Sequence, residues 1–498
     1  MKKFTSVILA LLVILSCATV FTFGTSAAWD GSVSVDFAGG NGTEKEPFEI
    51  ASAQDLALLA KKVNEEGNSF EGVYFKMTAD IDLGGTPWTS IGTAVESVNV
   101  FMGHFDGSGY TVSGLTMEET TNNTGLFGRI SGAVVENLTV KGSKVVGAKY
   151  TGGIVGYAIK GSTVYNCHTE IDHIEGITIG GIVGRSQDAA ADGSVNVIKG
   201  CTSKSNLRLL PGTNNVFAGG MVGAAGATEI SWCGNYGNIN GPEGATTLMC
   251  AGGIVGIQGA NGATTNVRNC FNLGDISILS TADATYAGGI VGRAAHVTAE
   301  TYIENCFSTG KTSVVDSTGV DLDEKHGSLI GHIRYVAFVS NCYTSVPISE
   351  CAEVGFDPNV CIETGNITVL SEAQMKGKDA VTNMKLGAGW VADAAGYPTI
   401  DVSAIKDEQT TVEQTTPAPV DTTTAAPVDT TTPAPADTTT PAPADTTTQA
   451  SAPADTTTTA PQSESDGGPN IFVILIIVVV VLAVGAVVVV VVMDKKKK

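Results

Sequence analysis

Six cysteines at similar intervals are the side chains of this sequence with the widest range of possible chemistry. They are Cys167, Cys201, Cys233, Cys270, Cys306 and Cys342, and several lie in an Asn-Cys-aromatic motif. Metal-binding cysteines commonly occur as Cys-x-x-Cys pairs, and no such pair is present. We therefore expect the six to be small buried core residues rather than metal ligands. Cys351 and Cys361 lie outside this series and are the pair expected to form a disulfide.

Histidines and carboxylates give no recognisable catalytic motif. The segment HTEIDH at 168–173 lacks the His-Glu-x-x-His order of zinc proteases. The acidic loop DLDEKHG at 321–327, which begins at Asp321, could bind Ca²⁺ or be a solvated loop. We predict no catalytic, cofactor-binding or metal-binding residues and no cofactor.

Arginines recur at one position of a repeated motif. Gly-flanked apolar pairs occur as GLFG at 125, GGIVG at 152, 180, 252 and 288, GGMVG at 219 and GSLIG at 327. Arg129, Arg185 and Arg293 each follow the closing glycine of a copy, so they align if the copies stack. The same position is filled elsewhere by other residue types, namely Tyr157, Ala224, Ile257 and His332. No continuous charged row is therefore predicted there.

The repeats predict the fold of the central segment. Each copy is followed by a second element, which is Asn137-Leu138 in the first copy and one of the six cysteines in the others, and the double-Gly copies start 28 to 39 residues apart. Short apolar runs between Gly, Asn and Ser indicate short strands without a helical period. Such a unit cannot bury its apolar face alone but can do so against its neighbours. The prediction is an all-β fold, a parallel β-solenoid in which right-handed coiling is favoured.

Stacked coils account for the recurring Asn-Cys pair. Equivalent positions of successive coils lie about 4.8 Å apart, so an inward cysteine repeats as a ladder. The neighbouring asparagines could form a second ladder through their amides. The glycines would serve turns with positive φ or close strand approach, and the sequence leaves these two roles open.

Two short helices are expected to cover the ends of the solenoid. Ser52-x-x-Asp55 is a capping-box pattern, followed by apolar residues on one helical face up to Gly67. Ser371-x-x-Gln374 opens a second short helix near the other end. Bare terminal strands would otherwise invite pairing with other chains.

The two ends of the chain predict export and anchoring. A charged start, an apolar run and small residues predict a signal peptide, and 23 uncharged residues before four lysines predict a membrane span with the lysines in the cytoplasm. A Thr/Pro/Ala-rich segment between them lacks the apolar residues needed for a core and is predicted to be a disordered stalk. The predicted segments are a signal peptide at 1–28, a solenoid at 29–402, a stalk at 403–470, a transmembrane helix at 471–493 and a tail at 494–498.

Composition limits the possible partners. The formal net charge is −22. An acidic surface argues against nucleic acid and against anionic membrane surfaces as partners. The membrane contact is expected through the C-terminal span alone.

With these motifs in view, the chain resembles the bacterial GLUG-repeat surface proteins. The resemblance rests on GTEKEPFEIASAQDLALLAKKVN, FMGHFDGSGYTVSGLTM, GLFGRI, the GGIVG copies and the closing GYPTI, and it extends from about 36 to 400. It implies an exported protein, with adhesion the usual supposition. The family includes zinc proteases that cleave immunoglobulin A, whose catalytic domain follows such repeats and has no counterpart here.

These observations predict a non-catalytic, surface-anchored protein that binds an extracellular glycan or matrix protein. The alternative is a surface-tethered carbohydrate-active enzyme, a polysaccharide lyase or hydrolase, since parallel β-helices commonly host them. Such an enzyme needs clustered carboxylates on neighbouring coils.

Overall fold

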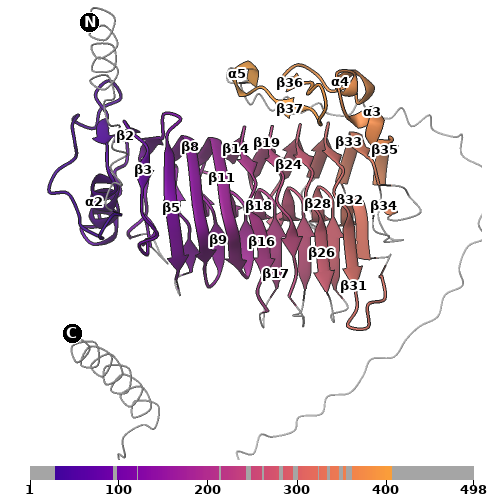
Figure 1. The fold of residues 1–498 in the computed structure, drawn as a ribbon, viewed down its shortest axis with the longest axis horizontal. Helices are drawn as coiled ribbons and strands as arrows, with labels where there is room; N and C mark the ends of the chain where they lie inside the picture. Colours follow the sequence, from indigo (N-terminus) through magenta and orange to yellow (C-terminus); the bar gives the residue numbers. More distant parts are fainter. Residues whose placement is uncertain are drawn as a thin grey trace, which may run out of the picture. The chain divides into compact units, whose positions relative to one another are not determined.

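The computed structural model shows an all-β parallel solenoid with few helices (Figure 1). It describes residues 28–93, 98–119, 122–211, 215–242, 248–260, 263–279, 284–294, 301–322, 325–333, 337–346, 352–354 and 362–405. Within these ranges, no helix is both long enough and apolar enough to cross a bilayer. The predicted signal segment to residue 27, Cys351, Cys361, and everything from 406 onward, including the predicted span and tail, lie outside the described residues.

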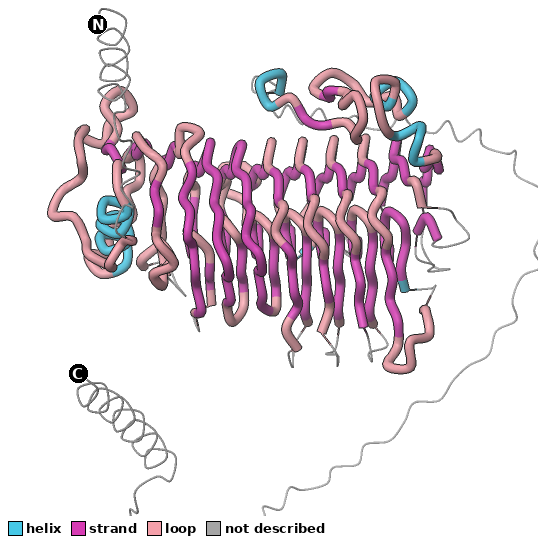
Figure 2. Tube along the Cα trace, in the orientation of Figure 1, coloured by secondary structure: helices cyan, strands magenta, loops and turns pink. Residues whose placement is uncertain are grey.

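One coil consists of five short strands separated by turns and loops (Figure 2). In the coil at 249–279 they are β22 (Met249–Gly252), β23 (Val255–Gln258), β24 (Thr265–Arg268), β25 (Phe271–Asn272) and β26 (Ile276–Leu279). Each pairs in parallel with its equivalent in the next coil, in the order β27 (Thr285–Gly288), β28 (Val291–Ala294), β29 (Thr301–Glu304), β30 (Phe307–Ser308) and β31 (Thr312–Val315). The predicted stacking of repeats is confirmed.

Across the described residues these pairings make two long parallel sheets. The larger sheet adds β1 (Phe48–Ile50), β2 (Tyr74–Met77), β3 (Ile81–Asp82), β4 (His104–Asp106), β5 (Thr111–Glu118), β8 (Val134–Val146), β11 (Thr163–Gly176), β14 (Asn196–Lys199), β15 (Thr202–Ser203), β16 (Asn206–Leu209), β19 (Thr228–Ser231), β20 (Gly234–Asn235), β21 (Ile239–Asn240), β33 (Ala337–Thr344) and β35 (Ile362–Val369). The smaller sheet adds β6 (Asn123–Thr124), β7 (Phe127–Ser131), β9 (Tyr150–Gly152), β10 (Val155–Ile159), β12 (Thr178–Gly180), β13 (Val183–Gln187), β17 (Val216–Gly219), β18 (Val222–Ala225), β32 (His326–Ile333) and β34 (Ala352–Val354).

The cysteine ladder is confirmed as core. All six side chains have no exposed surface, and each thiol lies near a backbone carbonyl of the preceding coil, as in Cys270 Sγ to Ile230 O at 3.8 Å and Cys306 Sγ to Val267 O at 3.7 Å. Burial raises the pKa of the Cys270 and Cys342 thiols well above the usual value. These thiols therefore stay protonated and behave as apolar side chains.

The asparagines before the cysteines have a backbone role that the sequence did not reveal. They adopt left-handed φ angles of 49° to 53°, a conformation that asparagine tolerates better than most residues. They are Asn166, Asn269, Asn305 and Asn341, and Asn137 has the same conformation before Leu138. The predicted amide ladder is present in part, since Asn341 Nδ2 donates to Asn305 Oδ1 at 2.7 Å.

The glycines of the GGIVG motif serve close approach, which settles the choice that the sequence left open. A Cβ on Gly252 would lie 2.0 Å from the carbonyl oxygen of Val255, and one on Gly253 would lie 2.1 Å from that of Gly289. Neither glycine is among those with positive φ. Consecutive coils approach too closely at this turn for any side chain.

The N-terminal helix covers the first coils, as predicted. Helix α2 (Ala53–Asn64) begins at Ser52, whose hydroxyl accepts from the Asp55 backbone N–H at 3.2 Å. Leu56, Leu59 and Val63 have no exposed surface and belong to the solenoid core. The helix lies at the N-terminal end of the stack (Figure 1).

The C-terminal helix does not cover the other end, so that prediction was wrong. Residues 370–405, here called the C-terminal strap, lie back along the side of the solenoid (Figure 1). They contain α3 (Glu372–Met375), α4 (Ala380–Asn383), the antiparallel pair β36 (Trp390–Val391) and β37 (Thr399–Ile400), and α5 (Val402–Ile405).

The strap lies there because it buries a row of aromatic side chains on the outside of the solenoid, Trp232, Phe271 and Phe307. Trp390 packs against Trp232, Phe271 and Phe307, with ring centroids 5.5 to 6.0 Å apart. The aromatic residues after the Asn-Cys pairs would otherwise expose a continuous apolar patch, which soluble surfaces avoid. The Ser371 capping box is present, but α3 is only four residues long.

Candidate functional site

The residues after the closing glycines form one row on the smaller sheet. Strand register pairs each with its equivalent in the next coil, so Arg129, Arg185 and Arg293 are aligned as predicted. Among the paired residues that the structure describes, the row is Arg129, Tyr157, Arg185, Ala224, Ile257, Arg293 and His332. Charge is discontinuous along it, also as predicted.

A second row, unnoticed in the sequence, runs beside the first. It contains Asn123, Tyr150, Thr178, Phe217, Cys250 and Tyr286. These residues lie two positions before the first glycine of each motif copy. Aligning the repeats on that motif would have revealed them.

The two rows meet closely in three neighbouring coils. The Arg185 guanidinium lies 5.0 Å from the centre of the Tyr150 ring, and its Nη1 donates to the Tyr150 hydroxyl at 2.6 Å. The Arg129 guanidinium lies 5.3 Å from the Tyr157 ring, and the Lys149 ammonium lies 4.9 Å from the Tyr150 ring. We call these five residues the N-terminal Arg–Tyr cluster. Cations over ring faces are attracted by the ring quadrupole, which holds the side chains in place.

Glycines bring the two rows together. A Cβ on Gly184 would lie 2.5 Å from the backbone nitrogen of Thr151, and one on Gly156 would lie 2.6 Å from that of Thr124. Side chains at these positions would force the two rows of strands apart. The repeated glycine frame therefore also positions the outward arginines and tyrosines.

A hollow of about 640 Å³ opens beside this cluster. Its lining includes Lys149, Tyr150, Arg185 and Phe217, together with Asn122, Ala148, Ile177, Thr178 and Asn215. The charged residues in this lining are both cations, although the chain carries a net charge of −22. Such a surface suits a ligand with anionic groups and faces that can stack on rings.

The Tyr157 phenol of the cluster stays neutral. Burial, followed by the charge of Asp188, raises the pKa of Tyr157. A protonated phenol can donate or accept a hydrogen bond. The charge of the cluster therefore comes from Arg129, Arg185 and Lys149.

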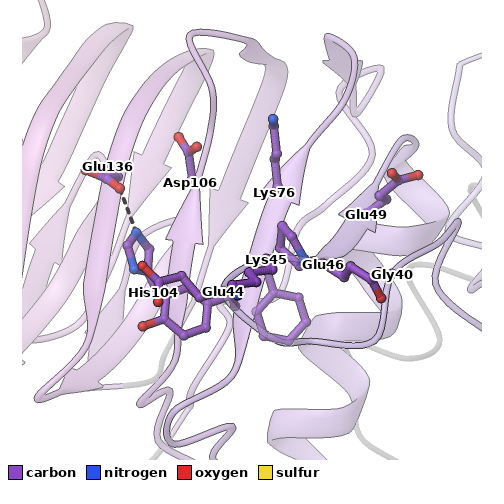
Figure 3. A pocket seen from close by; sticks show the side chains of 12 residues that line it. Gly40, Glu44, Lys45, Glu46, Glu49, Lys76, His104, Asp106 and Glu136 are labelled. Atoms are coloured by element: carbon purple, nitrogen blue, oxygen red, sulfur yellow. Dashed lines mark hydrogen bonds and ion pairs between the residues drawn. The ribbon is translucent and has the colours of Figure 1, made fainter.

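A second hollow, here called the N-terminal groove, lies over the first coils of the larger sheet (Figure 3). It also measures about 640 Å³ and combines acidic and basic side chains. Its charged lining residues are Glu44, Lys45, Glu46, Glu49, Lys76, His104, Asp106 and Glu136. The His104 ring points at the Glu136 carboxylate, with Nε2 2.6 Å from Oε1 (Figure 3).

Sequence reasoning missed this groove. Lys76, Asp106 and Glu136 are register partners on β2, β4 and β8. Glu136 directly precedes the first Asn-Leu element, so alignment on that element could have shown the row. The bordering loop with Glu44 to Glu46 carries no repeat signal.

The remaining predicted candidates are separate from both hollows. Asp321 pairs with the buried His326 at 2.8 Å. His168 lies on β11, and burial lowers its pKa. Across the described part of the chain, no three His, Cys, Asp or Glu side chains are grouped to hold a metal ion.

Known proteins resemble parts of this chain. No family model matches it. A crystal structure of a candidate immunoglobulin A1 protease from Bacteroides ovatus shares 20% sequence identity over 74% of this chain and 98% of that chain, with a TM-score of 0.51. At that identity the likeness concerns the fold alone.

Two curated proteins match in sequence over shorter segments. Halomucin from Haloquadratum walsbyi is 30% identical over 169 residues, which are 32% of this chain and 2% of halomucin. A candidate Gly-rich membrane protein from Evansella cellulosilytica is 35% identical over 117 residues, which are 22% of this chain and 12% of that protein. The chain thus spans a small part of these relatives, the second of which is named as a membrane protein.

Proposed function

We propose that this protein displays its solenoid outside the cell and binds anionic glycans at the N-terminal Arg–Tyr cluster, as an adhesin. The observation that carries the proposal is the hollow in which Lys149 and Arg185 are the charged residues among the described lining. The predicted signal segment and C-terminal span support the location, as does the relative named as a membrane protein.

The chemistry of the cluster favours a glycan over a matrix protein. A guanidinium presents a planar fork that matches a carboxylate or sulfate group. Tyr150 and Phe217 add partly exposed ring faces beside it. A chain of acidic sugars offers both anionic groups and apolar ring faces.

The test is retention of the full-length chain on a glycan array that pairs each uronate or sulfated glycan with its neutral counterpart. We expect retention on the anionic members that falls as salt rises, since exposed charges are screened. Arg185→Ala should weaken retention by about tenfold, roughly 1.4 kcal/mol.

Arg208→Ala is the matched control, because Arg208 is 63% exposed and lies on β16 of the other sheet. Equal retention on neutral glycans, or equal effects of the two arginine changes, would contradict the proposal. Retention on immobilised matrix proteins alone would favour the protein-ligand alternative.

The N-terminal groove supports a second candidate function, cleavage of a glycan. Glycosidases use two carboxyl groups that flank the scissile bond. Glu136, hydrogen-bonded to His104, is one, and Glu44 or Glu49 across the groove could supply the other. Asp106 is less available, because its carboxylate already accepts from Ser108 and Asn137.

A reducing-sugar release assay separates this candidate from binding alone. Release that Glu136→Gln reduces several hundredfold, with the fold intact by circular dichroism, would establish an enzyme. Glu170→Gln is the matched control outside the groove. Retention without release supports the adhesin.

A further inference from the structure

A second group of ring and cationic side chains lies farther along the same two rows. Tyr286 and His332 stack with ring centroids 4.1 Å apart and an interplanar angle of 20°. The Arg293 guanidinium lies 5.5 Å from the centre of the Tyr286 ring. We call these three residues the C-terminal Arg–Tyr cluster.

The positions between the two clusters carry no charge. They are Ala224 and Ile257 on one row, and Phe217 and Cys250 on the other. Burial raises the pKa of the Cys250 thiol to about 12, so it stays neutral. Ala224 and Cys250 are buried, so a ligand crossing this stretch would meet the partly exposed apolar side chains of Phe217 and Ile257.

Both rows also lack acidic residues along their paired length. None of the thirteen positions from Asn123 and Arg129 to Tyr286 and His332 is Asp or Glu, although the chain has 50 acidic residues. An anion could therefore follow the rows without meeting a carboxylate on them.

The spacing of the coils sets the scale of such a ligand. Neighbouring strands lie about 4.8 Å apart, so the three steps from Arg185 to Arg293 cover about 14 Å. The six steps from Arg129 to His332 cover about 29 Å by the same spacing. A single sugar cannot reach both clusters, whereas a linear chain along the solenoid axis can.

We propose that the C-terminal Arg–Tyr cluster is a second subsite, and that the ligand is a linear polyanionic glycan lying along the solenoid axis across both clusters. This inference rests on the proposed function of the N-terminal cluster. Linked subsites raise affinity because the second contact forms within an already bound ligand.

The experiment titrates the full-length chain with size-fractionated oligogalacturonates and, in a parallel arm, heparin-derived sulfated oligosaccharides. Short oligomers should bind at two per chain, one at each cluster. Oligomers that span the two clusters should bind at one per chain and at least tenfold more tightly. The two arms distinguish carboxylate from sulfate as the recognised anion.

Variants separate the two subsites. Arg293→Ala should reduce short oligomers to one per chain and weaken long oligomers at least tenfold. Arg185→Ala should likewise reduce short oligomers to one per chain, bound at the C-terminal cluster, and weaken long oligomers at least tenfold. Arg208→Ala should change neither the number of short oligomers bound nor the affinity for long ones. If Arg293→Ala lowers the melting temperature, Arg293→Gln is used instead.

The outcomes distinguish this inference from the function it rests on. Affinity independent of oligomer length, or an Arg293 variant that binds long oligomers like the unmodified chain, would overturn the second subsite. If Arg185→Ala still weakened binding, the proposed function would stand. If Arg185→Ala bound the oligomers as Arg208→Ala does, both the second subsite and the proposed function would be contradicted.

Discussion

The inward cysteine row and the outward row after the closing glycines lie on the same coils, yet they differ in composition. Inside, six successive coils place Cys at the same buried position. Outside, seven successive coils place Arg, Tyr, Arg, Ala, Ile, Arg and His at one position. Both rows follow the same parallel register.

The difference reflects what each side chain must contact. An inward side chain packs against its own equivalent above and below, in an interior packed as densely as a crystal. In the outward row five of the seven side chains are partly exposed and only Ala224 and His332 are buried, so the residue type can change at less cost to the neighbouring coil. Uniform rows therefore indicate packing, and variable rows on a constant frame are where binding residues are to be sought.

The largest effect is expected from a charge placed inside. Cys270→Asp should lower the free energy of unfolding by about 3 kcal/mol or more, because an unpaired carboxylate is buried among apolar side chains. Urea denaturation followed by circular dichroism measures it. Ile257→Asp is the counterpart in the outward row and should lower the free energy of unfolding clearly less. Equal losses would remove the distinction between the rows.

The glycine frame should tolerate even one added methyl group poorly. Gly253→Ala places a Cβ about 2 Å from the Gly289 carbonyl oxygen and should cost about 1–3 kcal/mol. Gly387→Ala is the control, because a Cβ there meets nothing within 4 Å. A neutral Gly253→Ala would mean that the coils can separate at this turn.

Removing one thiol should lower the free energy of unfolding less than the glycine substitution does. Cys306→Ala leaves a small cavity and should lower the free energy of unfolding by about 1 kcal/mol. Thiol labelling of the native chain should be slow at the ladder and should accelerate in denaturant. An Arg208→Cys variant provides an exposed thiol for comparison, and ladder thiols that label as fast would contradict their burial.

Much of the solenoid follows from sequence because its signals repeat. The order of motifs predicts the stacking, and a constant offset from the closing glycine places Arg129, Arg185 and Arg293 on one row. The cysteine ladder follows from the same regularity. When the same residue type recurs at the same position of several coils, each coil gives separate evidence for the role of that position.

Among features that occur once, the N-terminal helix was predicted from its capping box, but the long-range contacts were not. The strap packs Trp390 against Trp232, which lies 158 positions earlier in the chain, and no local pattern marks that contact. The N-terminal groove is lined by a single loop at 44–46 together with residues of β2 and β4. The left-handed backbone of the asparagines was missed for a different reason. Their recurrence was explained by stacking of their side-chain amides, and the backbone conformation that asparagine favours was not considered.

The smallest effect should come from an outward row of ion pairs. Glu170 lies between two lysines, with Lys204 Nζ at 2.8 Å and Lys141 Nζ at 2.9 Å. Hydrogen bonding first to Lys204 and then to Lys141 lowers the pKa of Glu170 from 4.5 to about 2. Because the folded pKa is lowered, these contacts stabilise the folded state above pH 4.5, and the stabilisation is lost as the pH falls toward 2.

The magnitude should be below about 1 kcal/mol, since the Glu170 side chain is 35% exposed and solvent screens the pairs. Urea midpoints of the unmodified chain and Glu170→Gln, compared at pH 7, 4 and 2.5, should differ at pH 7 and converge at pH 2.5. The difference at pH 7 should also shrink in 1 M salt, where the screening length is about 3 Å. A difference that stayed constant with pH would mean that Glu170 acts through packing, as an inward residue does, and the contrast between the two kinds of row would weaken.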